Sequence, residues 1–375
     1  MTAFRTKGRD LTGLSRIEPG RTVAVAVSGG VDSALAAWTL KQRGFRVLAF
    51  HLLLIPGAGS LPAARSMARR LELDFEALDV SQAFESLVIE PFVRTYALGR
   101  TPSPCVTCNP EVKFGLLADL ARRRGADFLA TGHYAGLVVR AEGATPVLVR
   151  PRDRTKDQTY FLSRLGPEKL DRALFPLAGF TKIEVKAKAA ALGLPETRES
   201  QEACFLAGRD YRDFLSSRLG PSPGEGGEFV DRRGRVLGRH RGLIHYTVGQ
   251  RRGLNLPGPE PYYVLALEQD TRRVVVGTKA ETLATGFLAT DLVWSSKPAQ
   301  DEFAALVQIR SRHKPARAWV SLRAGNQAEV FFESPQPAVA PGQAAAFYEG
   351  DWLRGGGWID RVRPVTSDTR PPEPA

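Results

Sequence analysis

An apolar run followed at once by a glycine-rich turn constrains this 375-residue chain most strongly. Residues 22–27 read Thr-Val-Ala-Val-Ala-Val, and residues 28–33 read Ser-Gly-Gly-Val-Asp-Ser. Adjacent glycines allow positive φ and let backbone amides approach an anion, and a helix starting there adds its N-terminal dipole. The pattern therefore predicts a strand, a phosphate-holding turn and a helix, with Ser33 as a candidate helix cap.

The turn differs from the two most familiar phosphate-binding signatures. It lacks the Gly-Lys-Ser/Thr end of a Walker sequence and the three spaced glycines of a dinucleotide fingerprint. A bare Gly-Gly pair would indicate an ordinary strand-to-helix turn. The full hexapeptide after a buried strand favours a phosphate site.

Strand and helix patterns alternate through the first half of the chain, which predicts a doubly wound, Rossmann-like parallel α/β sheet. Ligands of such sheets bind outside the carboxyl ends of the strands, so residues 28–33 and Gly132-His133-Tyr134 are expected to line one crevice. The expected strands are 22–27, 45–54, 75–80 and 127–131, and the expected helices are 32–43, 63–71, 82–96 and 111–124.

The second half changes character. A capping box, Thr181 to Glu184, predicts a helix to about residue 192, and residues 221–227 resemble a linker. Short strands are expected at 230–237, 262–267, 273–277, 305–309, 317–322, 327–332 and 344–348, the last four forming a small β-barrel. The predicted division is a loose extension 1–20, a sheet domain 21–205, a central α+β domain 206–287, a barrel 288–366 and a disordered tail 367–375.

The charge balance favours a polyanionic partner. Fifty-two Lys and Arg against 40 Asp and Glu give a net charge of +12 at pH 7, and basic faces bind nucleic acid by neutralising phosphates. The residues Arg310, Arg312, His313, Lys314 and Arg317 form one basic cluster, unless they are only a solvated strand edge. No apolar segment is as long as a membrane span, so we expect a cytoplasmic protein without a membrane partner, and a monomer.

The three cysteines, an odd number without a signal peptide, indicate a reducing compartment rather than a disulfide framework. Cys105 and Cys108 follow two prolines, and we expect them in a turn before a helix whose N-terminus lowers the thiol pKa. This Cys-x-x-Cys fits a redox pair, half a zinc site or two buried thiols. Cys204 alone would be a small buried hydrophobe.

Seven motifs in order give the chain a specific resemblance. They are residues 28–33, 99–115, 130–135, 156–162, 200–205, 245–254 and 342–343. Together they resemble the bacterial tRNA-specific 2-thiouridylase family of the PP-loop ATP pyrophosphatase superfamily. The resemblance implies that ATP, with Mg²⁺, activates the C2 oxygen of the wobble uridine in tRNAs for Lys, Glu and Gln, and that sulfur from a donor or relay protein replaces it.

The resemblance also implies residue roles. Cys108 corresponds to the nucleophile, Cys204 to the persulfide carrier, and Asp32 to a catalytic position. Matching ATP contacts are Ala26, Val27, Ser28, Gly29, Gly30, Val31, Asp32, Ser33, Leu52 and Gly132, although the loop after Leu52 departs from the family. Ser103, Pro104 and Cys105 match the loop that meets the target base. His133, Lys156, Asp157, Gln158, Arg310, Ser311 and Gln343 match tRNA contacts, although His133 also fits a satisfied polar core residue.

Two schemes for sulfur remain. In the persulfide scheme, Cys108 and Cys204 end as a disulfide that a reductant reopens. Many relatives carry aspartate where this chain has Cys105, so the three cysteines are also candidates for a 4Fe–4S cluster with one open iron. The persulfide route gives Cys105 no function, and we therefore expect the cluster. Alternative functions are another PP-loop sulfurtransferase, an amide-forming ligase or a non-catalytic tRNA-binding protein.

Overall fold

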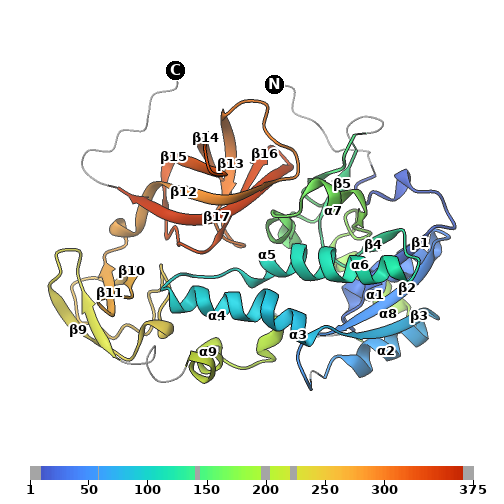
Figure 1. Ribbon diagram of the computed structural model, residues 1–375, viewed down its shortest axis with the longest axis horizontal. Helices are drawn as coiled ribbons and strands as arrows, with labels where there is room; N and C mark the ends of the chain where they lie inside the picture. Colours follow the sequence, from blue (N-terminus) through green and yellow to red (C-terminus); the bar gives the residue numbers. More distant parts are fainter. Residues whose placement is uncertain (1–9, 58, 140–143, 196–202, 220–225, 366–375) are drawn as a thin grey trace.

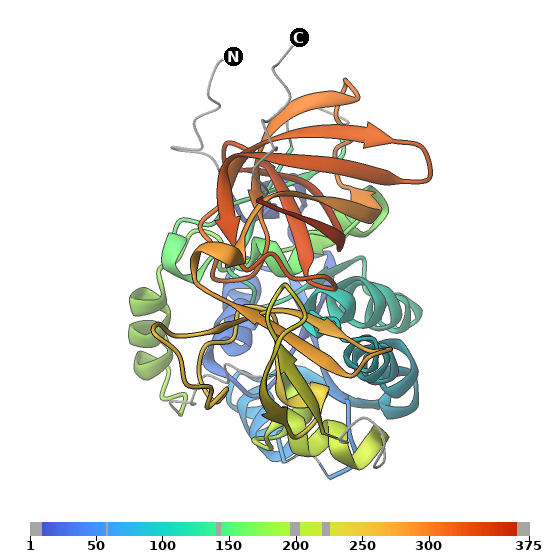
Figure 2. The same ribbon diagram turned by 90° about the vertical axis from the view of Figure 1, so that its left-hand side faces the viewer.

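The computed structural model describes residues 10–57, 59–139, 144–195, 203–219 and 226–365 (Figure 1). It contains an α/β domain, a small central sheet and a β-barrel that lies above both (Figure 2). Residues 221–225 of the predicted linker 221–227, the tail 367–375 and the first nine residues lie outside the described residues, and Gly227 begins a strand. Within them, no helix is long and apolar enough to cross a bilayer.

The α/β domain confirms the predicted parallel sheet. Its strand order is β3-β2-β1-β4-β7, and every neighbouring pair is parallel. The strands are β1 (Thr22–Ala26), β2 (Arg46–Leu53), β3 (Asp74–Asp79), β4 (Phe128–Ala130) and β7 (Ala173–Leu174). Separate apolar clusters cover its two faces, one around Leu35 and Val185 and the other around Phe114 and Phe175. Burial on both faces explains why the central strand β1 is a continuous apolar run, whereas the edge strand β3 carries Asp74, Glu76 and Asp79.

The helices of this domain follow the predicted positions within a few residues. One long helical segment, α5 to α6, begins at Pro104 rather than at residue 111, so the cysteine pair lies inside a helix. It runs beside α4 in Figure 1. The helices are α1 (Val31–Gln42), α2 (Leu61–Arg70), α3 (Ser81–Phe84), η2 (Glu85–Ile89), α4 (Glu90–Ala97), α5 (Pro104–Cys108), η3 (Asn109–Leu117), α6 (Ala118–Arg123), α7 (Pro167–Asp171), α8 (Lys182–Ala191) and α9 (Tyr211–Leu219).

Three local predictions are wrong. Ser33 does not cap α1; the cap residue is Gly30, and the Ser33 hydroxyl donates to its carbonyl at 2.9 Å. Residues 10–16 are not loose, because Leu14 is 2% exposed within a short helix, η1 (Leu14–Arg16), that packs on the sheet domain. The expected strand 230–237 is a turn between two strands, since Asp231 accepts hydrogen bonds from the amides of residues 233 and 235.

The central sheet has the order β10-β11-β8-β9. Its strands are β8 (Gly227–Val230), β9 (Val236–His240), β10 (Tyr263–Glu268) and β11 (Arg273–Gly277). The barrel that follows confirms the predicted small β-barrel. It closes because β12 pairs with both β15 and β17.

The barrel is larger than the sequence indicated. Its first and last strands were not predicted, and the hairpin of β5 and β6 from the α/β half extends its sheet through β17. The strands are β5 (Gly136–Val138), β6 (Val147–Val149), β12 (Leu283–Trp294), β13 (Glu302–Gln308), β14 (Ala316–Arg323), β15 (Gln327–Pro337), β16 (Ala344–Glu349) and β17 (Trp352–Pro364).

Candidate active site

The turn between β1 and α1 has the geometry of an anion cradle. Gly29 has φ +85°, and a Cβ there would lie 3.0 Å from the backbone nitrogen of Ala64. The first bond of the helix runs from the Ala34 amide to the Gly30 carbonyl, at 3.1 Å. The amides of residues 31–33 precede that bond, so they lack a partner within the helix and point out of its N-terminus.

Gly132 closes against this turn. A Cβ on Gly132 would stand 2.8 Å from the Ser33 nitrogen and 2.9 Å from the Asp32 carbonyl carbon. Only glycine allows the end of β4 to approach the helix N-terminus so closely. The structure therefore brings together the two segments that the sequence placed in one crevice.

Asp32 has a partner that sequence reasoning missed. The Lys182 ammonium donates to its two carboxylate oxygens at 2.7 and 2.8 Å, and the Tyr134 hydroxyl donates at 2.9 Å. The Lys182 side chain is 9% exposed and that of Asp32 33%. Lys182 is the first residue of α8, whose capping box is present as predicted. The capping box was the only sequence signal near Lys182, because it predicts that the helix begins at this residue.

His51 is hydrogen-bonded to the residue that leads into the cradle. It is buried on β2, with Nδ1 2.8 Å from the Val27 carbonyl oxygen and Nε2 3.2 Å from the Ser60 hydroxyl. Leu52, the next residue, is half-buried near the carboxyl end of the strand. Ala26 and Val27 lead into the turn itself.

The cysteine pair lies on the first turn of α5. Cys105 is exposed and Cys108 is buried, and a spacing of three residues puts both on one helix face. The expected lowering of their pKa values by the helix N-terminus is wrong. Burial raises the pKa of the Cys108 thiol to about 12. Cys105 keeps accessible surface, but the protein packed around it also desolvates its thiolate and raises its pKa. Desolvation of the thiolate outweighs the helix dipole here.

Cys204 lies beside this pair. It begins the short helix η6 (Cys204–Leu206) and is exposed, so it is not the buried hydrophobe that an isolated cysteine would suggest. Its neighbour Phe205 packs edge-on against Phe92, with ring centroids 5.1 Å apart, in the same cluster as Cys108. Charge on Cys204 also raises the pKa values of Cys105 and Cys108. Cys204 therefore shares one site with Cys105 and Cys108, although it lies far from them in sequence.

The structure does not support the predicted iron–sulfur cluster. All three cysteines lie within the described residues, and all three are free thiols. No group of three or more His, Cys, Asp or Glu side chains in the described part of the chain is arranged to hold a metal ion. As arranged, the cysteines do not fit a cluster that needs three of them as ligands.

His133 links the cysteines to the cradle. It follows Gly132, is half-buried, and its Nδ1 lies 2.8 Å from the Thr131 hydroxyl. Burial, and then the charge of Lys113, hold its pKa well below the usual value, so the ring is neutral. The same Lys113 lowers the pKa values of all three thiols against the effect of burial.

Several side chains that were predicted to contact tRNA are hydrogen-bonded to other residues of the protein. The Gln343 amide donates to the carbonyls of Thr101 and Pro102 at 3.3 and 3.1 Å, and its oxygen accepts from Tyr160. Ser103, which is buried, precedes α5 and is hydrogen-bonded to Tyr160. The barrel thus holds the segment that leads into the cysteine helix.

Asp157 and Gln158, two further predicted tRNA contacts, also form interactions within the protein. Asp157 pairs with Arg150 and accepts from the Thr159 hydroxyl at 2.6 Å. Gln158 accepts the Tyr134 amide at 2.8 Å, so it orients the segment after β4. Lys156 ends a short helix, η4 (Arg154–Lys156), and is half-buried.

Only some side chains of the basic cluster on the barrel are exposed. Ser311, Arg312, Lys314 and Arg317 are exposed. Arg310 donates to the Pro337 carbonyl at 3.1 Å. His313 is buried, its Nε2 lies 3.0 Å from the Gln336 side-chain oxygen, and burial lowers its pKa, so it does not add charge to this face.

Comparison with known proteins decides the family. The chain is 43% identical over 358 residues to the tRNA-specific 2-thiouridylase MnmA of Geobacter metallireducens, with 91% of this chain and 97% of the relative covered. It is 45% identical to the MnmA of Desulforudis audaxviator, covering 90% and 98%. The chain belongs to the tRNA-specific 2-thiouridylase family. The MnmA of Geotalea uraniireducens is a third such relative, 41% identical over 360 residues.

Three family models match this 2-thiouridylase family member along its length. The first, described as a tRNA methyl transferase HUP domain, matches residues 21–208. A tRNA methyl transferase PRC-barrel domain matches residues 212–278, and an aminomethyltransferase β-barrel domain matches residues 284–359. These ranges contain the parallel sheet, the central sheet and the barrel in turn.

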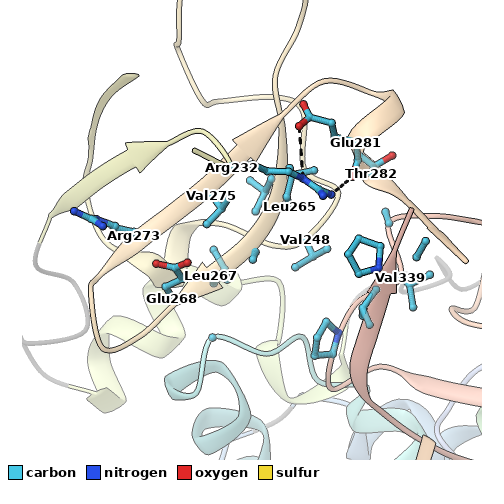
Figure 3. A pocket seen from close by; sticks show the side chains of 18 of the residues that line it. Arg232, Val248, Leu265, Leu267, Glu268, Arg273, Val275, Glu281, Thr282 and Val339 are labelled. Carbon is cyan, nitrogen blue, oxygen red and sulfur yellow. Dashed lines mark hydrogen bonds and ion pairs between the residues drawn. The ribbon is translucent and has the colours of Figure 1, made fainter. Parts of the chain in front are cut away.

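A separate cleft of about 600 Å³ lies between the central sheet and the barrel (Figure 3). Its walls carry Leu265, Leu267 and Val339, and Arg232 on its rim donates to the Glu281 carbonyl at 2.7 Å. None of the family-matched site residues lines it. The charged groups we identify at its edge are paired, so the cleft does not resemble a phosphate site.

Proposed function

We propose that this protein is an ATP-dependent tRNA-uridine 2-sulfurtransferase that converts the wobble uridine to 2-thiouridine. The observation that carries the proposal is the continuity of the site. The anion cradle packs against Gly132, and the next residue, His133, has its pKa lowered by the charge of Lys113. The same charge lowers the pKa values of the three thiols against desolvation. Transfer of an adenylyl group to an oxygen, followed by attack of sulfur on the carbon that bears it, requires the phosphate site and the thiols to lie close together.

The cradle residues suit the activation step. A carbonyl oxygen is a poor leaving group, so transfer of an adenylyl group to it makes departure as AMP feasible. The amides at the α1 N-terminus and the hydroxyl of Ser28 would hold the departing pyrophosphate, while the Ser33 hydroxyl is bonded to the Gly30 carbonyl and shapes the turn. Mg²⁺ would neutralise phosphate charge, and it usually needs only one or two carboxylates besides the phosphates. Asp32 is the carboxylate at this turn, and it would give up a bond to Lys182 to take that role.

The thiols suit the second step. Exposed Cys204 receives the sulfur as a persulfide, and the Cys108 thiolate attacks the inner sulfur of that persulfide. A Cys108–Cys204 disulfide forms, and the hydrosulfide released displaces AMP from C2. A dithiol reductant must then reopen the disulfide. Because the three cysteines do not fit a cluster, we propose this persulfide route.

The partners follow from the same chemistry. A basic chain of net charge +12 suits tRNA, and the target base must leave its stack to reach the cradle. We propose anticodon loops of the Lys, Glu and Gln type as substrates and a persulfide-bearing protein as the sulfur donor. We also propose functional units at 21–205, 206–287 and 288–366, which the matched ranges support.

Nucleoside mass spectrometry of tRNA incubated with the protein, ATP and a persulfide donor tests the function. We expect 2-thiouridine from the wild type, and pyrophosphate without 2-thiouridine from Cys108→Ser and Cys204→Ser. Cys105→Ser is the matched control and should keep its activity in an iron-free protein. A thiolated base elsewhere in the tRNA, or no pyrophosphate release at all, would overturn the proposal. A brown, iron-containing wild type that Cys105→Ser inactivates would overturn the persulfide route.

A further inference from the structure

Lys113 is a cation in the sulfur site to which neither the family motifs nor the mechanism above assigns a role. It lies on η3, five residues after Cys108, and is half-buried. Within the described ranges, no residue forms a hydrogen bond or an ion pair with it. A half-buried ammonium that has no carboxylate partner among the described residues is costly to keep.

The helix register puts Lys113 on the cysteine face. In an α-helix, five residues turn the chain by about 140° beyond a full turn, so Lys113 would face away from Cys108. The segment η3 is a π-helix that starts directly after Cys108, so its turns are five residues wide; at its end the Ala118 amide bonds the Lys113 carbonyl in the same register. Five residues then complete little more than one turn, which brings Lys113 over Cys108.

Local sequence explains this rare register. Pro110 has no amide hydrogen, so the α-helical bond to residue 106 cannot form. Its carbonyl accepts the Lys169 ammonium at 2.8 Å, and a Cβ on Gly115 would lie 2.7 Å from that carbonyl oxygen. Proline and glycine, five residues apart, therefore favour the wider turn at this point. Widened turns of this kind are frequent at functional sites.

The charge of Lys113 reaches every thiol of the site. It opposes the effect of burial on the pKa values of Cys105, Cys108 and Cys204. The net result is still a pKa of about 12 for Cys108, so its thiol is protonated at neutral pH before the reaction, and the charge of Lys113 reduces the free-energy cost of the thiolate when it forms. A lysine side chain is also long and flexible, so one ammonium can follow negative charge from one sulfur to the next.

We propose that Lys113 is the cation that stabilises the thiolates of Cys108 and Cys204 during sulfur transfer, and that the widened helix turn exists to present it. The inference rests on the proposed function. In this step the Cys108 thiol loses its proton to solvent, so no further reactant is needed. Lys113 acts on the reacting sulfurs through its charge.

Thiol alkylation on the full-length protein, without ATP or tRNA, tests the proposal. Iodoacetamide rates for each cysteine are measured by peptide mass spectrometry between about pH 7 and pH 10. We expect Lys113→Met to slow alkylation of Cys108 by about tenfold at a fixed pH, because a nearby cation shifts a thiol pKa by about one unit or more. Lys113→Arg should keep most of the rate, and the exposed Lys279→Met serves as the matched control.

Two results would overturn the assignment. One is an unchanged alkylation rate in a folded Lys113→Met protein. That result would mean that the Lys113 ammonium does not act on the thiols, and it would favour a contact with a phosphate of the substrate instead. The other is slowed alkylation with full formation of 2-thiouridine. Circular dichroism and ATP binding show whether the variant is folded. If the wild type forms no 2-thiouridine while the alkylation difference persists, the proposed function fails and the effect of Lys113 on the thiols stands.

Discussion

Replacing Lys182 by Met tests how the phosphate cradle is held before ATP arrives. The change keeps the length of the side chain and the start of α8, but it removes the ammonium that bonds both oxygens of Asp32. Asp32 then carries an uncompensated charge in the first turn of α1. The same charge would repel an incoming triphosphate.

The size of the effect follows from burial. Hydrogen bonds to charged groups contribute about 1.5–3 kcal/mol each in protected sites. Asp32 is 33% exposed, so water compensates part of the loss, and we expect about 2 kcal/mol for the pair. For a domain of this size that lowers Tm by about 4–8 °C. We also expect ATP affinity to fall by about tenfold.

The decisive measurement is a double-mutant cycle with Asp32→Asn, followed by denaturant unfolding and ATP calorimetry. The double variant should lose much less stability than the two single changes added together, because it leaves neither charge alone. Lys188→Met, on the same helix over Trp38, is the control and should bind ATP normally. Losses that add within about 0.5 kcal/mol would refute the reasoning.

Three further changes test other parts of the site. Gly132→Ala puts a Cβ 2.8 Å from the Ser33 nitrogen, so ATP calorimetry should show at least a tenfold weaker affinity, and an unchanged affinity would contradict the close packing. Gln343→Ala removes the bonds to the carbonyls of residues 101 and 102, and amide exchange just before α5 should rise in the tRNA-free protein; unchanged exchange would leave Gln343 as an RNA contact alone. His133 stays neutral when folded, whereas the unfolded chain takes up its proton below about pH 6.5, so stability is full above that pH and falls by up to about 1.4 kcal/mol per pH unit below it. His133→Gln should flatten that part of the Tm profile, and an unchanged slope would argue against a neutral ring.

The sequence located the cradle because its signals are local. An apolar strand, two glycines and a capping box each act over a few residues, and the structure has β1, the turn and α8 within one or two positions of the expectation. Lys182 escaped notice because its partner lies 150 residues earlier. No local pattern marks such a pair.

The barrel strands show a second limit. Residues 355–357 are three glycines, which by themselves indicate a loop, yet they lie in the middle of β17. A Cβ on Gly355 would stand 2.2 Å from the Val293 carbonyl oxygen, and one on Gly356 would stand 2.8 Å from the Ala345 oxygen. Here glycine serves close strand packing in a small closed barrel rather than a turn. Only the tertiary neighbours reveal that use.

The pairing of the β5–β6 hairpin with β17 has a consequence for synthesis. Val149 leaves the ribosome long before its partner Trp352 is made, about 200 residues later in the chain. Until then β6 offers an open strand edge to other nascent chains. The α/β domain therefore keeps this edge uncovered until β17 is made, late in translation. A truncated chain that ends before β17 should recruit chaperones or aggregate rather than accumulate as a separate ATP-binding domain.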